Sequence, residues 1–154
     1  AEALLRTRFP LTADLSAPQA DILRLAGIYG PGRLIARLET LRSEKPLDVN
    51  PAGWLNLIHV DDAARMAVAI AEAGRKGRTW LVADDRPMLR ADFYTLVASK
   101  AGTPAPKFEA EKLSETERNS LGKRCANTLI RNLLPTTLMF PSAEEGISHA
   151  LKSA

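Results

Sequence analysis

Asn56-Leu57-Ile58-His59-Val60-Asp61-Asp62-Ala63-Ala64-Arg65 is the stretch that decides the fold. An apolar run leads to two acids, and apolar residues then recur at helical spacing, on the side formed by Ala63, Met66, Ala67 and Ile70. This order predicts a strand that passes directly into a helix. Asp61 or Asp62 can cap the free N–H groups at the helix start and suits its positive dipole end. We expect His59 to be structural, as a strand residue beside the cap that bonds to the backbone.

A second stretch, upstream of the first, predicts another strand. Residues 20–28 are mostly apolar, broken only by Asp21 and Arg24, which is typical of a strand buried on both faces in a parallel sheet. The run ends at Tyr29-Gly30-Pro31-Gly32, a strong turn signal at the carboxyl end of that strand. The leucine spacing that follows predicts a helix over residues 34–44.

The rest of the chain continues this alternation of strands and helices. The predicted elements are a strand at 54–60, a helix at 61–72, a strand at 79–83, a helix at 91–100, a short strand at 107–110, and helices at 127–134 and 142–151. Residues 1–8 read as the middle of a helix and residues 9–19 as a loop. The order of elements from residue 20 to residue 100 is β-α-β-α-β-α, which is typical of a parallel α/β arrangement.

Several helix ends carry their own signals. Gly102 follows the helix at 91–100, as a helix C-terminus prefers. Ser114 is spaced from Glu117 as in a capping box. Asn127 and Ser142 stand where their side chains can cap the last two helices.

The composition is that of an ordinary globular domain of 154 residues, 45% hydrophobic and 25% charged. The 21 basic and 18 acidic residues are interspersed and only 5% of residues are aromatic, so we predict no nucleic-acid partner. No apolar run reaches the roughly 18–20 residues of a membrane span and no signal peptide is visible, so we predict no membrane partner. The single cysteine, Cys125, excludes an internal disulfide and fits a reducing compartment, which favours a cytoplasmic location.

The sequence lacks the motifs that carry catalysis or bind a metal. The glycines of residues 27–32 do not have the G-x-G-x-x-G spacing of a phosphate-binding turn, and Pro31 has no N–H to donate. No tyrosine is followed four residues later by lysine, and no serine sits in a G-x-S-x-G turn. The two histidines, His59 and His149, are far apart in sequence and have no metal-ligand spacing. We therefore predict no catalytic residue and no metal site in this chain.

Together, these stretches resemble the extended or atypical short-chain dehydrogenase/reductases, the NAD-dependent epimerase/dehydratase family, and in particular its nucleoside-diphosphate-sugar-epimerase-like members. Residues 26–32 are similar to the family's loop that passes the nicotinamide, and residues 56–64 to its N-R-I-H-V-D-D-x-A segment near the substrate cleft. Residues 80–87 resemble the last sheet strand with its exit turn. Residues 123–127 and 140–146 resemble the closing segments.

The resemblance implies an α/β fold that contains the C-terminal part of a Rossmann-type parallel sheet and a small mixed α/β substrate-binding lobe. The chain would then be a single partial domain. Residues 1–33 and 78–87 would be the last elements of the dinucleotide-binding sheet, and residues 34–77 and 88–154 the lobe and its closing helices.

The chemistry implied by the resemblance is hydride transfer between a substrate carbon and NAD or NADP. The family's catalytic Tyr and Lys and its glycine loop lie upstream of where this chain begins, so we expect the isolated chain to be inactive and not to hold the cofactor alone. The implied cofactor contacts are Ala26, Gly27, Ile28 and Tyr29. The implied substrate contacts are Arg33, Asn56, His59, Lys123, Arg124 and Asn127. The implied substrate is a small molecule of the sugar-nucleotide kind, although Leu57 replaces the Arg that binds a substrate phosphate in some relatives.

Two other classes of function stay open. A truncated, non-catalytic interaction module would expose an apolar sheet edge that includes Ile22, Leu23 and Leu25. Such an edge would pair with a missing N-terminal half or with a second copy of the chain. A nucleic-acid binder would draw on the sequence pI of about 9.2.

Overall fold

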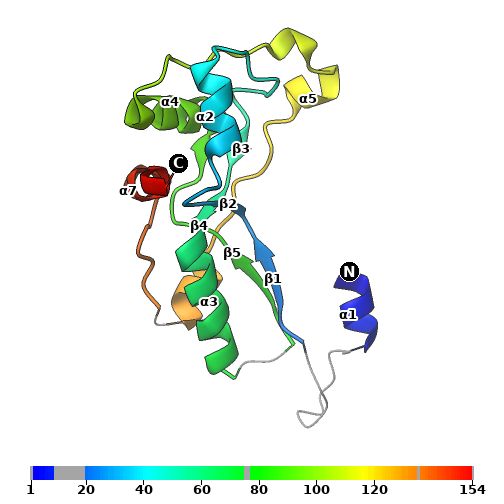
Figure 1. Cartoon of the computed structure of the whole chain (residues 1–154). Coiled ribbons are helices and arrows are strands. Elements are labelled where there is room, and N and C mark those ends of the chain that lie inside the picture. Colours follow the sequence, from blue (N-terminus) through cyan, green and yellow to red (C-terminus); the bar gives the residue numbers. More distant parts are fainter. Residues whose placement is uncertain (1, 9–19, 75–76, 135, 154) are drawn as a thin grey trace.

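The computed structural model describes residues 2–8, 20–74, 77–134 and 136–153, and within these ranges the strands form three pairs (Figure 1). The strands are β1 (Ile22–Leu25), β2 (Gly27–Tyr29), β3 (Trp54–Leu55), β4 (Leu57–His59), β5 (Thr79–Val82) and β6 (Met88–Leu89). β1 pairs with β5 and β2 pairs with β4, both in parallel, whereas β3 pairs with β6 in antiparallel. The predicted α/β fold with parallel strands is confirmed.

The helices are α1 (Glu2–Arg8), α2 (Ile35–Arg42), α3 (Val60–Glu72), α4 (Arg90–Ala101), α5 (Glu115–Asn119), α6 (Thr128–Leu133) and α7 (Ala143–Ala150). Short 3₁₀ turns occupy Ala110–Lys112 and Leu151–Ser153. Each helix predicted from the sequence is present, with ends within a few residues of those expected. The predicted strand at 107–110 is reduced to a single bridge between Leu47 and Phe108, and the predicted loop at 9–19 lies outside the described residues.

Two of the predicted helix ends have the expected local geometry. α4 stops at Gly102, which adopts the left-handed conformation at φ 65° that glycine reaches without steric cost. α5 begins with a complete capping box, in which the Ser114 hydroxyl accepts the Glu117 N–H and the Glu117 carboxylate accepts the Ser114 N–H.

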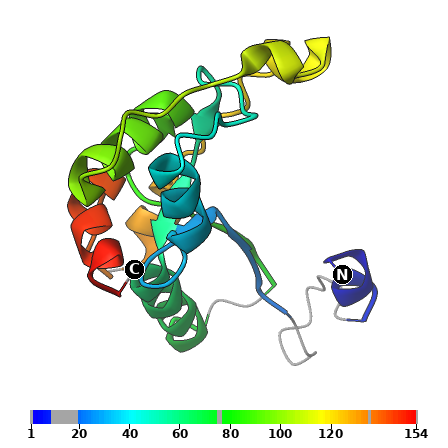
Figure 2. The same cartoon turned by 45° about the horizontal axis from the view of Figure 1, so that its top comes forward.

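The helices divide into two groups around the strands. α2, α4 and α7 gather at one end of the molecule, and α3 lies along the strands at the other end (Figure 1, Figure 2). The first group encloses an apolar cluster that includes Leu38, Val97 and Ile147. The second cluster lies between α3, α6 and the strands and includes Ile58, Met66 and Trp80.

The apolar side predicted for the 61–72 helix is the buried side of α3. Ala63, Met66 and Ile70 are each exposed by 6% or less, whereas Ala67 is half-buried. Burying apolar surface stabilises the fold by about 25 cal/mol for each square ångström removed from water. The burial of these side chains therefore determines which face of α3 packs against the sheet.

The prediction of one continuous strand over residues 20–28 is wrong, because the chain changes strand partner at Ala26. The Ala26 N–H donates to Val82 O of β5, and the next N–H, from Gly27, donates to Asn56 O beside β4. The strand is also less buried than predicted, since Leu25 is 44% exposed and the other residues of β1 are half-buried or exposed.

The predicted strand at 54–60 is divided in the same way. Its first part, β3, pairs with β6, and its second part, β4, pairs with β2. Asn56 separates the two parts, and its side chain bonds to a third segment, through Lys123 O and Cys125 N–H. Val60 already belongs to α3. Alternation along one strand could not reveal that its two ends have different partners.

The predicted capping of α3 by an aspartate is wrong, because His59 takes that position. The His59 Nδ1 accepts the Asp61 N–H at 3.2 Å. Asp62 is instead buried, and its two carboxylate oxygens accept the N–H groups of Met139 and Phe140 at 2.8 and 2.9 Å. Asp62 thus fastens the segment before α7 to the first turn of α3.

Asn127 and Ser142 occupy the N-cap positions of α6 and α7, but neither side chain caps its helix. The Asn127 amide donates to the end of β5, and the Ser142 hydroxyl bonds the Glu145 carboxylate at 3.1 Å. Both side chains are taken by other partners, which for Asn127 lie more than 40 residues away in sequence. In the described part of the chain no helix is long and apolar enough to cross a membrane.

The Asp62 contact generates a stability prediction. We expect Asp62→Ala to lower the free energy of unfolding by about 2–4 kcal/mol, because it leaves two backbone N–H groups without their acceptor in a partly buried place. Asp61→Ala is the matched control: its side chain is 47% exposed, and we expect a loss below about 1 kcal/mol. Urea denaturation of the three proteins measures both values, and equal effects of the two substitutions would contradict the assignment.

Candidate functional site

The carboxyl ends of β2, β4 and β5 meet at one place. β2 and β4 end side by side at Tyr29 and His59, and the Asp84 N–H after β5 donates to Leu57 O of β4 at 2.7 Å. In open parallel sheets the carboxyl ends of the strands are where ligands bind. The segment before α7 also reaches this place, because the Asp85 N–H donates to Pro141 O at 2.9 Å.

Tyr29 points into the interior at this junction. Its side chain is 2% exposed, its hydroxyl donates to Ser142 O at 3.2 Å, and its ring lies directly against Gly146 of α7. Burial raises the pKa of the Tyr29 phenol above its ordinary value of 10, with smaller contributions from Asp84 and Asp62. The Tyr29 hydroxyl is therefore engaged by the protein itself.

The other predicted cofactor contacts lie at the junction between β1 and β2. Ala26 and Ile28 are half-buried, and Gly27 is exposed. A Cβ at Gly27 would lie 3.2 Å from Asn56 O and 3.3 Å from the Leu57 side chain, so a larger residue would crowd β4. Arg33, a predicted substrate contact, is exposed and its Nε donates to Ile28 O at 3.3 Å.

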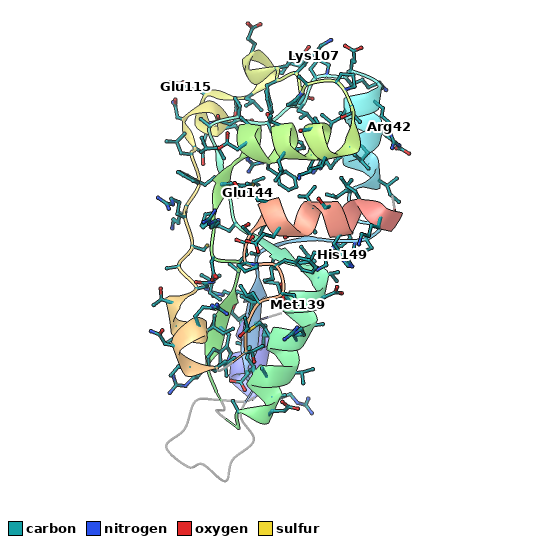
Figure 3. All side chains as sticks on the ribbon, turned by 90° about the vertical axis from the view of Figure 1, so that its left-hand side faces the viewer. Arg42, Lys107, Glu115, Met139, Glu144 and His149 are labelled. Carbon is teal, nitrogen blue, oxygen red and sulfur yellow. The ribbon has the colours of Figure 1, made fainter. Side chains whose placement is uncertain are left out.

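His59 is fully buried between aromatic rings. Its ring centroid lies 4.2 Å from that of Phe140 and 5.2 Å from that of Tyr29. Because its Nδ1 accepts the Asp61 N–H, the proton of the neutral ring lies on Nε2. That Nε2 is 3.2 Å from Nδ1 of His149 on α7 (Figure 3), which therefore accepts. Burial lowers the pKa of His59, against the charge of Asp61, so the ring is held neutral.

The pairing of the two histidines is what sequence spacing could not reveal, since 90 residues separate them. Among the described residues, His59, Asp61 and His149 offer ligand atoms within 4.8 Å of one another. The facing ring nitrogens already bond each other, and the second nitrogen of His59 accepts the cap. These groups are thus satisfied by the protein, and the absence of a metal site stays a prediction.

The two predicted asparagine contacts hold the segment 123–127 in place. Asn56 donates to Lys123 O at 2.8 Å and accepts the Cys125 N–H at 2.6 Å. Asn127 donates through Nδ2 to Ala83 O, Asp84 O and the Asp85 carboxylate. These amides fix the backbone beside the end of β5.

A pocket of about 380 Å³ opens beside this segment. It is lined by Asp85 and Pro87, from the turn after β5, and by residues 124–128. Arg124 and Asn127, two of the predicted substrate contacts, therefore line the same pocket, and their role in binding stays a prediction. The sequence did not predict three of the lining residues as contacts: Asp85, the half-buried Cys125 and Thr128. For Asp85, the available signal was the pair of acids directly after a predicted strand.

Asp84 lies behind the pocket with its side chain buried at 1% exposure. One carboxylate oxygen accepts the Arg86 N–H at 3.2 Å, and the other has no hydrogen-bond partner in the described part of the chain. Burial raises the pKa of the Asp84 carboxyl from 3.8 to about 7. This carboxyl therefore changes charge near neutral pH.

Comparison with known proteins was made with this geometry in hand. No protein-family model matches the sequence. A 3-diazoavenalumate denitrifying reductase from a Streptomyces species is 30% identical over an alignment of 138 residues, which covers 82% of this chain and 45% of the reductase.

Two solved structures share the fold. A Methylobacillus flagellatus protein assigned as an NAD-dependent epimerase/dehydratase is 28% identical, with a TM-score of 0.66, over 89% of this chain and 48% of its own. A UDP-glucuronic acid 4-epimerase variant from Bacillus cereus, in complex with UDP-4-deoxy-4-fluoro-glucuronic acid and NAD, is 19% identical, with a TM-score of 0.68, over 86% and 44%.

The chain spans a little less than half the length of the relatives that it matches. The predicted resemblance to the epimerase/dehydratase family is supported at the level of the fold, by solved members of that family. The extended or atypical subtype stays a prediction.

The Asp84 carboxyl generates a pH prediction. Its pKa is raised on folding, so its contribution to stability is complete below pH 3.8 and is lost as the pH rises through about 7. The side chain introduced by Asp84→Asn carries no charge at any pH. We therefore expect the difference in free energy of unfolding, variant minus parent, to rise by about 2–4 kcal/mol between about pH 4.5 and about pH 8.

Urea denaturation across that pH range measures the difference. Asp48→Asn makes the same substitution at an exposed position and is the control. A pH-independent difference for Asp84→Asn would contradict burial as the cause of the raised pKa.

Proposed function

We propose that this chain supplies the last strands of the dinucleotide-binding sheet and the substrate-binding lobe of an NAD(P)-dependent epimerase/dehydratase-like oxidoreductase. The observation that carries the proposal is the meeting of three strand ends beside an open pocket, in a fold shared with an epimerase that holds NAD and a sugar nucleotide. The reaction class is hydride transfer between a substrate carbon and a nicotinamide. The sequence has no glycine phosphate loop and no Tyr-x-x-x-Lys pair, so the isolated chain is proposed to contribute substrate-binding residues without holding the cofactor or catalysing the reaction.

The proposed domain division follows the sequence prediction, with residues 1–33 and 78–87 in the sheet and residues 34–77 and 88–154 in the lobe. We assign the cofactor contacts to residues 26–28, of which Gly27 is exposed and Ala26 and Ile28 are half-buried. Tyr29 and His59 are positioning residues, because both side chains are buried and bonded within the protein. The location that fits the lone, unpaired Cys125 is the cytoplasm.

We propose that Lys123 and Arg124 face the substrate. Both are exposed, and Arg124 lines the pocket, while Asn56 and Asn127 hold the backbone of this segment. The substrate is proposed to be a small molecule. The named relatives are a reductase named for 3-diazoavenalumate and an epimerase named for UDP-glucuronic acid, which leaves the sugar-nucleotide and isomerase assignments as narrower options within this proposal.

A cofactor titration tests the proposal. We expect this chain alone to show no saturable binding of NADH or NADPH. Fusing it to the part of the Methylobacillus flagellatus protein that the match leaves uncovered should complete the sheet and give binding at least about 10-fold tighter than either part alone.

Nucleotide fluorescence measures the binding, and circular dichroism shows whether the fusion is folded. The uncovered part on its own is the control. A folded fusion that binds neither nucleotide would contradict the proposal.

A second candidate function rests on β1. Among the described strands β1 has one neighbour, β5, so its other backbone edge is unpaired, and Leu25 on it is 44% exposed. Such an edge favours strand addition. The corresponding role is an interaction module that pairs with a missing N-terminal half or with a second copy.

Self-association distinguishes this candidate. If a second copy covers the edge, light scattering after gel filtration should give a mass above the 16.7 kDa of one chain, and Leu25→Lys should return it to one chain. Leu129→Lys is the matched control, because Leu129 is 56% exposed on α6 and away from the strand. A single-chain mass for the unmodified protein at high concentration would exclude pairing with a second copy.

A further inference from the structure

The pocket beside β5 is small. Its volume of about 380 Å³ lies near the lower limit for small-molecule sites, about 300–1,000 Å³. A pocket of this size accepts a ligand built on one ring rather than a dinucleotide. Pro87 and Ala126 form the apolar part of the pocket wall, and the remaining lining residues supply its polar groups.

The charges around this pocket do not cancel. The Asp85 carboxylate accepts Asn127 Nδ2 at 2.6 Å and lies 3.4 Å from Arg131 Nε, so a cation already faces it. Arg86, on the same turn, pairs with Glu144 of α7 (Figure 3) at 3.3 Å.

Arg124 is different, because it has no carboxylate partner among the residues that the structure describes. Its guanidinium lies over the Trp54 ring, 4.6 Å from the ring centroid. Lys123, its neighbour, is also exposed and without an acidic partner in the described ranges. Arg124 therefore brings to the pocket a positive charge that no described carboxylate pairs with.

The Arg124 side chain is also preorganised, since contacts within the protein hold it in place. Asn56 bonds the backbone on both sides of it, at Lys123 O and Cys125 N–H, and the indole supports its planar group from one face. Stacking on an aromatic face leaves the N–H edges of a guanidinium free. Those edges form the fork that matches the two oxygens of a carboxylate.

From this geometry we infer that the pocket binds a small organic acid carrying a single carboxylate, and that Arg124 recognises that carboxylate. The inference rests on the proposed function, since it names the substrate class of that site. A nucleoside diphosphate is disfavoured for two physical reasons. Its several negative charges would meet one guanidinium fork, and the Asp85 carboxylate would repel them more strongly than it repels the single charge of one carboxylate.

The test uses the full chain and two probes of the same shape, one with a carboxylate and one with a neutral amide in its place. We expect 4-hydroxybenzoate to shift the backbone amide signals of residues 125–128 and to bind about 10-fold tighter than 4-hydroxybenzamide. Arg124→Gln should remove that preference, and Arg124→Lys, which keeps the charge but not the fork, should retain part of it.

Arg37→Gln is the matched control. The Arg37 guanidinium also lies over an aromatic ring, 6.0 Å from the centroid of Tyr94, but it does not line the pocket. This control should bind both probes as the parent does, and the amide spectrum shows whether each variant is folded.

Equal binding of acid and amide, no binding of either, or an unchanged preference in Arg124→Gln would each overturn the inference. Tighter binding of UDP than of 4-hydroxybenzoate would also overturn the inference, if Arg124→Gln abolished the binding of UDP. None of these outcomes depends on a nicotinamide cofactor, so failure here is distinct from failure of the NAD(P)H titration of the fusion.

Discussion

The buried carboxylate of Asp62 is the contact on which the rest of this structure depends. It stands in the first turn of α3 and accepts two consecutive N–H groups, from Met139 and Phe140. An unpaired backbone N–H in such a place costs about 1–3 kcal/mol, so the segment before α7 has one favourable position. That position carries α7 across the ends of β2 and β4, where Ile147 enters the first apolar cluster.

Further contacts then close the same junction. Tyr29 bonds Ser142 O, His59 bonds His149, and the Asp85 N–H bonds Pro141 O. These groups lie at strand ends, the place where a parallel sheet ordinarily meets its ligand. Because the C-terminal segment takes up their donors and acceptors, the groups left for a ligand lie further out, on residues 123–128 and the turn after β5. The structure thus separates side chains that hold the strand ends together from side chains that line the candidate pocket.

This separation sets how much could be predicted from the sequence. Periodicity predicted the helices and the buried side of α3, and the carboxyl ends of the strands lie beside the candidate pocket. Residue type alone could not distinguish Asn56 and Asn127, which hold the backbone, from Arg124, which faces the pocket, because both kinds of side chain suit a ligand. Contacts between residues far apart in the chain could not be predicted, such as the one between His59 and His149, which are separated by 90 residues. The changes of strand partner at Ala26 and Asn56 also depend on neighbours distant in sequence.

Native-state hydrogen exchange of the Met139 and Phe140 amides tests the central claim most directly. If the Asp62 carboxylate fixes this segment, the two amides should exchange only through global unfolding, as slowly as those of β4 and β5. Exchange near the rate of an unprotected loop, while the strand amides stay protected, would contradict the account. The C-terminal segment would then open independently, and the strand ends, with Tyr29 and His59, would be accessible to a ligand.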